Sequence, residues 1–255
     1  MAQADRVYTV GVVPQYSAPK IFTIWRPILK ELKTKTGLDF KLKMARSIPE
    51  FEKRFEKGEF DFAYMNPYHL LIANKKQGYV PLVKDVKRKL YGILVVHKDS
   101  SIKKVEELQG KKVAFPAPNA LGASLLQRSD LKIKYNIDIK PKYVKTHDAV
   151  YMNVALGKVS AGGGVYKTFK KQPPEVQKQL RVIYETSKTA PHPIAAHPKV
   201  DQAVQAKVKH ALIELGQTDK GHALLSKIPM KQIGPASLQD YLPLNTLGIE
   251  AFYNQ

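Results

Sequence analysis

The feature that most constrains this chain is a regular alternation of apolar, strand-like runs with amphipathic, helix-like ones. The first run, residues 6–13, is apolar enough to be buried on both faces of a sheet. Ser17-Ala18-Pro19 follows it, a polar cap and an early proline that are typical of a helix start, and Gly37 suits the end of that helix. Strand–helix units in succession predict a largely parallel sheet with helices on both faces.

The alternation continues through most of the chain and starts again after the apolar run 90–97. Further strands are expected at 38–44, 60–64, 79–83, 90–97, 111–116, 140–144, 159–164 and 181–185. Helices are expected from 17, 49, 66, 101, 122, 148 and 165, and a helical tail after His192 at 200–215, 219–228 and in part of 238–254. This order predicts two α/β lobes with more than one chain crossing, a cleft between them and a tail that packs back on the first lobe.

The composition excludes several classes of protein. The chain has 255 residues, of which 44% are hydrophobic and 25% charged, which is the balance of a globular fold. It contains no Cys, so disulfide scaffolds, thiolate metal sites and cysteine nucleophiles are excluded. The sequence holds no apolar run of the roughly 18 residues that a membrane span requires.

A net charge of +20 raises the question of an anionic partner. The Lys and Arg residues are scattered along the chain, outside any helix-turn-helix, zinc-finger or aromatic RNA-binding signature. We therefore expect solvated basic surfaces and a small anionic ligand, with no nucleic-acid partner.

The first residues carry a weak sign of export. Ala2-Gln3-Ala4 fits the small-x-small pattern before a signal-peptidase cut, although no charged or apolar segment precedes it. An ordinary polar terminus fits the same residues. The export interpretation predicts a signal peptide that has been removed from this chain.

Several predicted strand-to-helix junctions carry polar or aromatic residues. In parallel α/β units such junctions share one edge of the sheet, and helix N-termini there bind anions. The junctions are 14–17, 64–68, 118–124, 146–148 and 162–166. Asn66, Asn119 and Ser124 could each serve only as helix caps, but the set together favours a ligand site. Three successive glycines, 162–164, would let the backbone approach a bound group.

Signatures of catalysis are absent from the sequence. There is no nucleophile elbow, no phosphate-binding P-loop, no zinc-protease motif and no dinucleotide fingerprint. His147-Asp148 is the one apparent acid–base pair, and it keeps a small α/β hydrolase or transferase as an alternative. Pro193 between His192 and His197 argues against a zinc pair. We expect no enzymatic activity, no metal and no cofactor.

Three segments of the chain resemble a known family. They are DFAYMNPYHLLIA at 61–73, KKVAFPAPNALGASLL at 111–126 and HDAVYMNVALGKVSAGGGV at 147–165. The order and spacing of these segments resemble the phosphonate/phosphate/phosphite solute-binding proteins of ABC transporters, often called PhnD-like. The resemblance implies a type II periplasmic binding protein, with two lobes that close over a small ligand. It would place lobe one at 1–92 and 192–255, lobe two at 93–191, and crossing strands near 90–97 and 185–194.

Two departures from the family bear on the ligand. The turn that holds phosphonate oxygens with Ser and Thr hydroxyls in the family is here Ala120-Leu121-Gly122, and only Ser124 remains further along. The positions of the carboxylates that hold an amino group correspond to Lys167 and His192. An aminophosphonate is therefore not expected, because its ammonium group would meet no counter-charge.

The resemblance and the junctions together define a predicted site. Its side chains are Tyr16, Tyr64, Asn66, Asn119, Ser124, His147, Tyr166 and His192. Its backbone donors are Ala120, Leu121, Gly122, Ala123, Gly163 and Gly164. The tyrosines would wall the cleft and donate hydroxyls, and His147, beside Asp148, would donate to the anion.

The function that the resemblance implies is capture of a small anion for an ABC transporter permease. The anion would be a phosphate- or phosphonate-like oxyanion or another small acid, and the protein would act as a monomer. A receptor of the same fold, which reports ligand occupancy to a membrane signalling protein, is the alternative that the sequence leaves open.

Overall fold

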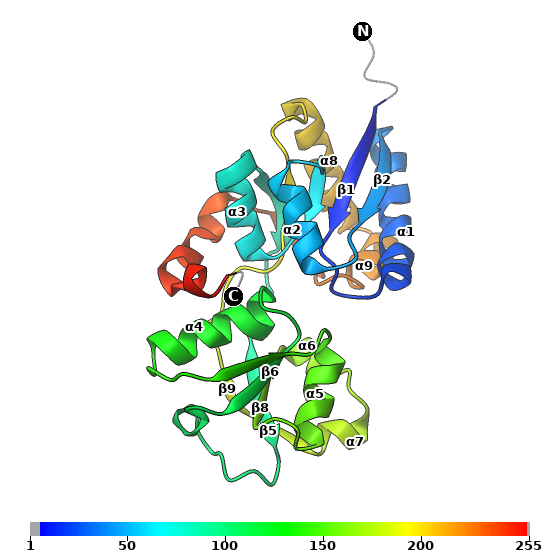
Figure 1. The fold of residues 1–255 in the computed structure, drawn as a ribbon. Coiled ribbons are helices and arrows are strands. Elements are labelled where there is room, and N and C mark those ends of the chain that lie inside the picture. Colours follow the sequence, from blue (N-terminus) through cyan, green and yellow to red (C-terminus); the bar gives the residue numbers. More distant parts are fainter. Residues whose placement is uncertain (1–5, 254–255) are drawn as a thin grey trace. The chain divides into compact units, whose positions relative to one another are not determined.

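The structure is a computed structural model that describes residues 6–253 and divides into two compact units (Figure 1). Unit 1 contains the chain up to Lys89 together with Ala190–Leu242, and unit 2 contains Leu90–Thr189 and the chain from Pro243. The chain therefore passes between the units three times. The first residues, on which the signal-peptide prediction rests, lie outside the described residues.

Unit 1 is built on a six-stranded sheet in the order β11-β4-β10-β3-β1-β2. The strands are β1 Val7–Val12, β2 Asp39–Met44, β3 Phe62–Tyr64, β4 Val80–Asp85, β10 Ile194–Ala196 and β11 Ile233–Pro235. β2 and β3 run parallel to β1, whereas β10 pairs antiparallel with β3 and β4, and β11 antiparallel with β4. The return of the chain from unit 2 thus inserts one reversed strand into the middle of a parallel sheet.

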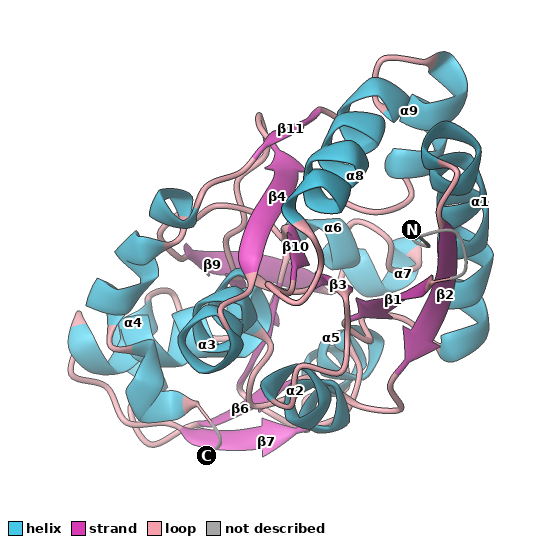
Figure 2. Cartoon of the chain, turned by 90° about the horizontal axis from the view of Figure 1, so that it is seen from above, coloured by secondary structure: helices cyan, strands magenta, loops and turns pink. Residues whose placement is uncertain are grey.

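The helices of unit 1 cover both faces of that sheet. They are α1 Ala18–Thr36, α2 Ile48–Glu56, α3 Pro67–Gln77, α8 Gln202–Leu215 and α9 Asp219–Leu225. α1 packs with α8 and α9 on one face, and α2 packs with α3 on the other (Figure 2). The apolar stripe of α1 is buried as its spacing predicts, and Gly37 ends the helix in the left-handed conformation with φ of 70°.

Unit 2 contains a five-stranded sheet in the order β7-β6-β8-β5-β9. The strands are β5 Ile93–His97, β6 Lys112–Phe115, β7 Lys140–Tyr143, β8 Ala161–Gly164 and β9 Leu180–Glu185. β6, β7 and β8 are mutually parallel, and β5 runs antiparallel to β8 and β9. Just before β5 and just after β9, Leu90 and Thr189 exchange backbone hydrogen bonds of 2.9 and 2.8 Å, so the two segments that enter and leave the unit are paired.

Helices sandwich this second sheet as well. They are α4 Leu126–Ile133, entered through a π-helical turn Leu121–Leu125, then α5 His147–Ala155, α6 Tyr166–Phe169 and α7 Pro174–Gln177, with a 3₁₀ turn at Val105–Leu108. Leu131 of α4 joins a core with Leu94, whereas Val150 of α5 joins a core with Ile93. Because neighbouring strand residues point to opposite faces, α4 and α5 lie on opposite sides of the sheet.

The end of the chain departs from its predicted place. The tail forms 3₁₀ turns at Leu238–Asp240, Leu242–Leu247 and Ile249–Phe252. From Pro243 onward it belongs to unit 2, where the Ser129 hydroxyl of α4 donates to the carbonyl of Leu247. The expectation that the whole tail packs on the first lobe is therefore wrong for this part. Its short apolar runs carry no sign of which lobe they cover.

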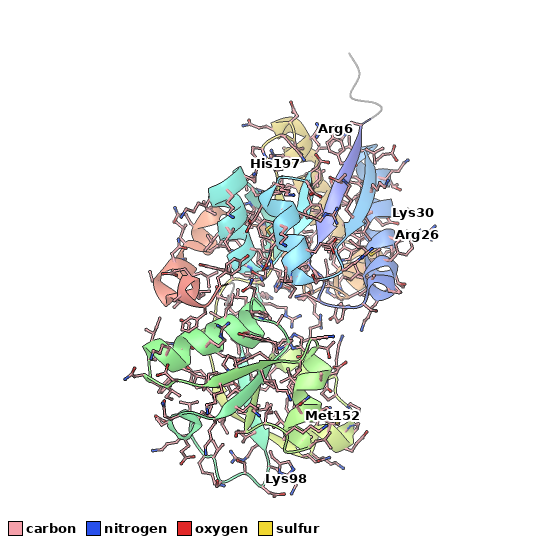
Figure 3. The ribbon with its side chains drawn as sticks, in the orientation of Figure 1. Arg6, Arg26, Lys30, Lys98, Met152 and His197 are labelled. Carbon is pink, nitrogen blue, oxygen red and sulfur yellow. The ribbon has the colours of Figure 1, made fainter. Side chains whose placement is uncertain are left out.

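The basic side chains are distributed over the surface of both units. Arg26 and Lys30 project from the outer face of α1, and Lys98 projects from the turn after β5 (Figure 3). Within residues 6–253, no helix combines the length and the apolar character needed to cross a bilayer.

Candidate functional site

In unit 1 the predicted residues gather at one edge of the sheet. Tyr16 follows the carboxyl end of β1, and Tyr64 is the last residue of β3. The antiparallel pairing of Ile194 with Tyr64 places the start of β10, and His192 just before it, at the same edge. Parallel strands that end together thus assemble these side chains from distant parts of the chain.

Tyr64 is the best-enclosed member of this group. It is 1% exposed, and its ring lies 5.2 Å from that of Trp25 and is stacked 5.4 Å from that of His192. Its hydroxyl has no hydrogen-bond partner within residues 6–253. Burial raises the pKa of Tyr64 well above its ordinary value, so this hydroxyl keeps its proton and is available as a donor.

Gln15 and Tyr16 complete the unit 1 edge. The amide nitrogen of Gln15 lies 2.8 Å from Nε2 of His192, a contact that fixes the imidazole and that the sequence analysis did not predict. Tyr16 lies beneath the ammonium group of Lys20, which is 4.3 Å from its ring centre, and burial raises the pKa of Tyr16. A hollow of about 10 Å³ lined in part by Tyr16, Trp25 and Tyr64 has room for about one water molecule.

Asn66 has a clear structural role. Its side-chain oxygen accepts a hydrogen bond of 2.8 Å from the backbone N–H of His69 and so caps α3. The helix-cap reading of Asn66 is therefore correct, and any contact of its amide with a ligand stays a prediction.

In unit 2 the segment after β6 is opened by the π-helical turn. The amides of Leu125 and Leu126 donate to the carbonyls of Ala120 and Leu121, five residues back. The N–H groups of Leu121–Ser124 precede these bonds and point out of the helix N-terminus, where they can receive an anion. Ala120 differs, because its own N–H donates to the carbonyl of Ala117 at 3.4 Å. It is not an open donor.

Two buried polar side chains flank this turn. Ser124 is 0% exposed, and its hydroxyl has no partner within the described residues. The amide nitrogen of Gln127 donates to the carbonyls of Ile93, Gly122 and Gly164 at 2.9, 2.9 and 3.1 Å. Gln127 thus ties the turn to β5 and β8, and a glutamine one helical turn after Ser124 is the signal that could have revealed it.

The three glycines of β8 have a different purpose from the predicted one. They lie inside the strand, and an added Cβ would meet Val150 at Gly162, Gln127 and Ala123 at Gly163, and the Tyr151 hydroxyl at Gly164, all within 2.6 Å. The space that each added Cβ would need is already occupied by atoms of α4, α5 and the π-helical turn of the same unit. The run allows α4 and α5 to pack closely on the sheet, so it gives no sign of a ligand, and Gly163 and Gly164 are ladder residues.

His147 is the first residue of α5, which Thr146 caps by accepting a bond of 3.1 Å from the Ala149 amide. Its Nδ1 is joined to the Thr168 hydroxyl at 3.1 Å, and Thr168 is joined to the Tyr151 hydroxyl at 2.8 Å. Burial lowers the pKa of His147 to about 4, against the opposing field of Asp148. The imidazole is neutral near pH 7 and can offer a hydrogen bond without a charge.

This pKa makes the stability of the protein depend on pH. The unfolded-state pKa of about 6.5 exceeds the folded one of about 4, so the folded state favours the neutral ring. The contribution is complete above about pH 6.5 and is lost as the pH falls towards 4, a change of about 3 kcal/mol. Unfolding free energies measured in urea across this range should fall less steeply for His147→Gln. An identical slope in the variant would contradict this assignment.

Tyr166 and Asp148 are engaged elsewhere. The Tyr166 hydroxyl donates to the Glu185 carboxylate at 2.7 Å, which raises the pKa of Tyr166 to about 12, so it is not the open donor that the sequence analysis predicted. Asp148 accepts a hydrogen bond of 2.7 Å from Gln172, while the His147 ring bonds Thr168. The two neighbours thus point to different partners, which removes the geometric support for a His–Asp catalytic pair.

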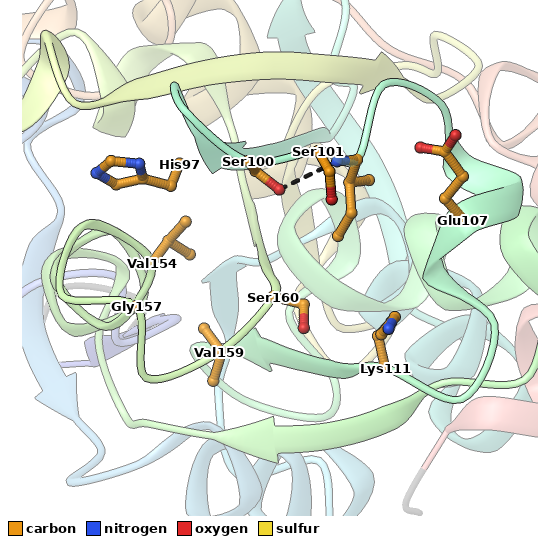
Figure 4. A pocket seen from close by; sticks show the side chains of 10 residues that line it. His97, Ser100, Ser101, Glu107, Lys111, Val154, Gly157, Val159 and Ser160 are labelled. Atoms are coloured by element: carbon orange, nitrogen blue, oxygen red, sulfur yellow. Dashed lines mark hydrogen bonds between the residues drawn. The ribbon is translucent and has the colours of Figure 1, made fainter.

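Unit 2 also contains a hollow of about 520 Å³ (Figure 4). Its lining residues lie at the edge of the sheet opposite the turn 118–124. Lys111 and Ser160 precede β6 and β8, and His97 ends the reversed strand β5. This hollow is therefore separate from the turn at 118–124. Within residues 6–253, no group of three or more His, Asp or Glu side chains is placed to hold a metal ion.

Comparisons with known proteins agree on the family. The family described as "ABC transporter, phosphonate, periplasmic substrate-binding protein" matches residues 10–241. The phosphonates-binding periplasmic protein of Escherichia coli is 20% identical, over 97% of this chain and 77% of its own length.

Two solved structures share the fold. A binding protein component of an ABC phosphonate transporter from Pseudomonas aeruginosa superposes with a TM-score of 0.82 at 18% identity, over 94% of this chain and 85% of that one. A Prochlorococcus marinus protein solved in complex with methylphosphonate has a TM-score of 0.83 at 15% identity, over 96% and 98%. The chain therefore belongs to the family of periplasmic substrate-binding proteins of phosphonate ABC transporters.

Proposed function

We propose that this protein binds a small phosphorus oxyanion whose substituent carries no positive charge, such as methylphosphonate or phosphite. In this proposal the bound ligand is delivered to an ABC permease from the periplasm, without chemical turnover. The observation that supports the proposal is the π-helical turn, because its first N–H groups, at Leu121–Ser124, precede the helical hydrogen bonds and the buried Ser124 hydroxyl has no partner within the described residues. In the proposal these groups form an anion cradle.

The remaining site residues are consistent with such a ligand. Tyr64 offers a protonated hydroxyl, and His147 offers a neutral imidazole. The resemblance places Lys167 and His192 at the positions of the carboxylates that it implies for holding an amino group. Replacing the missing hydroxyls with backbone donors preserves hydrogen bonds to the oxyanion while leaving the substituent without a cation partner.

A ligand panel tests the proposal directly. Thermal shift and calorimetry would compare methylphosphonate, phosphite, phosphate, 2-aminoethylphosphonate, sulfate and small carboxylates. A ligand at about 100 times its Kd adds about 2.7 kcal/mol to the free energy of unfolding. We expect methylphosphonate or phosphite to bind at least about tenfold more tightly than 2-aminoethylphosphonate. Burying an ammonium group without a partner costs more than the roughly 1.4 kcal/mol that corresponds to a tenfold change in Kd.

A matched variant sharpens the comparison. Lys167→Glu restores a carboxylate and should raise the affinity for 2-aminoethylphosphonate while lowering that for methylphosphonate. Tightest binding of 2-aminoethylphosphonate by the unaltered protein, or binding of carboxylates alone, would refute the proposal.

A further inference from the structure

Arg128 is a buried guanidinium in α4, one helical turn after Ser124, and is only 5% exposed. Its Nη1 donates to the carbonyl of Pro118 at 3.4 Å and to that of Phe252 at 3.2 Å. A single nitrogen therefore links the start of the turn 118–124 to the far end of the described chain.

Two aromatic rings hold the guanidinium in place. Its central carbon lies 5.2 Å from the ring of Phe252 and 5.8 Å from that of Tyr143, the last residue of β7. Both distances are within the range of cation–π attraction. The planar group is thus oriented by its faces as well as by its hydrogen bonds, which a lysine ammonium cannot reproduce.

The segment 247–253, which we call the C-terminal strap, is fastened to α4 at further points. The Ser129 hydroxyl donates to the carbonyl of Leu247, and Gly248 turns the chain with φ of 61°. A Cβ on Gly248 would come within 2.3 Å of the Ile133 side chain, so the strap lies directly on the helix there. Ile249 is fully buried.

We propose that Arg128 is a positioning residue for the turn 118–124, and that the C-terminal strap holds Arg128 in the orientation that fixes Pro118. Pro118 immediately precedes Asn119 and the row of N–H groups at Leu121–Ser124. An anion cradle made of backbone donors depends on that backbone being held rigidly. Arg128 binds the carbonyl of Pro118, and the strap contacts the same guanidinium through the carbonyl and the ring of Phe252.

This inference rests on the proposed function only in taking the turn as the anion cradle, and its first test needs no ligand. Hydrogen exchange followed by mass spectrometry would compare the unliganded protein with Arg128→Lys and Arg128→Gln. Amides of 119–126 should exchange at least about tenfold faster in both variants, because the Gln side chain is shorter and the Lys ammonium lacks the planar group that lies against Phe252 and Tyr143. Lys132→Gln, which removes a positive charge from the same helix at an exposed ion pair with Asp138, should leave that segment unchanged.

The second test measures the affinity for methylphosphonate by calorimetry. Both Arg128 variants should weaken binding about tenfold or more, whereas Lys132→Gln should stay within about twofold of the unaltered protein. Phe252→Ala should act in the same direction, and its effect should be much smaller when Arg128 is already Gln, because the two residues form one unit.

The outcomes separate the two proposals. If the unaltered protein fails to bind any phosphorus oxyanion, the proposed function fails, and the exchange experiment still decides the role of Arg128. If Arg128→Gln lowers the melting temperature but leaves both the exchange of 119–126 and the methylphosphonate Kd unchanged, Arg128 merely packs the strap. That result would overturn the inference.

Discussion

Replacing His69 by Leu should lower the free energy of unfolding of unit 1 by about 3–5 kcal/mol. His69 in α3 is fully buried, and its Nε2 lies 2.9 Å from Oε1 of Glu52 in α2, which is 4% exposed. The rings of Phe51 and Phe55 lie 5.9 and 5.4 Å from the imidazole. Removing the ring leaves a carboxylate among apolar groups without this donor, and that desolvated charge dominates the effect.

Companion variants test the cause of this loss. Replacing both Glu52 and His69 by Leu should recover most of the stability, because no buried charge is then left behind. Asp39→Ala, which breaks an exposed ion pair with Lys33 in the same unit, should change the free energy by less than about 1 kcal/mol. Urea titrations followed by the fluorescence of Trp25, the only tryptophan in the chain, report on this unit. A double variant as unstable as His69→Leu would show that shape, not charge, is decisive.

The second large effect is expected from Gly92→Ala, at the entrance to β5. An added Cβ would lie 1.9 Å from the carbonyl oxygen of Gly122 and 2.6 Å from the amide nitrogen of Gln127. The backbone of the turn 118–124 would have to move, and the Gln127 bond to Gly122 would be strained. We expect a loss of about 2–3 kcal/mol in unfolding free energy and at least about tenfold weaker oxyanion binding.

Gly110→Asn is the matched control for this substitution. Gly110 has φ of 69° with open space around its Cβ position, and asparagine tolerates that conformation. It should change stability by less than about 1 kcal/mol and leave binding unaffected. Calorimetric unfolding with and without methylphosphonate measures both quantities. Unimpaired oxyanion binding by Gly92→Ala would mean that the turn at Gly122 does not hold the ligand.

Periodicity predicts the regular elements of this protein well. α1 begins after Ser17 and ends at Thr36, as the early Pro19 and the left-handed Gly37 favour, although the Ser17 side chain makes no cap hydrogen bond. β10 and β11 were missed, because three residues are too few to show any alternation, and both are strands only through their neighbours. The placement of the strap was likewise missed, since it depends on contacts with α4 from residues more than 100 positions away in sequence.

The candidate site is only partly visible in the sequence. Junctions between strands and helices predict Tyr64 in unit 1 and, separately, Ser124 and His147 in unit 2, because the parallel strands of one sheet end at the same edge of that sheet. Sequence could not show that Tyr166 is engaged by Glu185, since that depends on where β9 ends. Nor could it show that Arg128 reaches Pro118, because an arginine in a basic chain is usually a surface residue.

The three passages of the chain between units have a consequence for the order in which the molecule can be made. Unit 1 remains without β10, β11, α8 and α9 until all of residues 90–189 have been synthesised. Unit 2 in turn remains without the strap until the second half of unit 1 has emerged. Neither unit can therefore complete its fold until residues of the other unit have been synthesised. Members of this family are periplasmic proteins. A fold that is completed late keeps the nascent chain unfolded for longer, which is the state in which a chain can be exported.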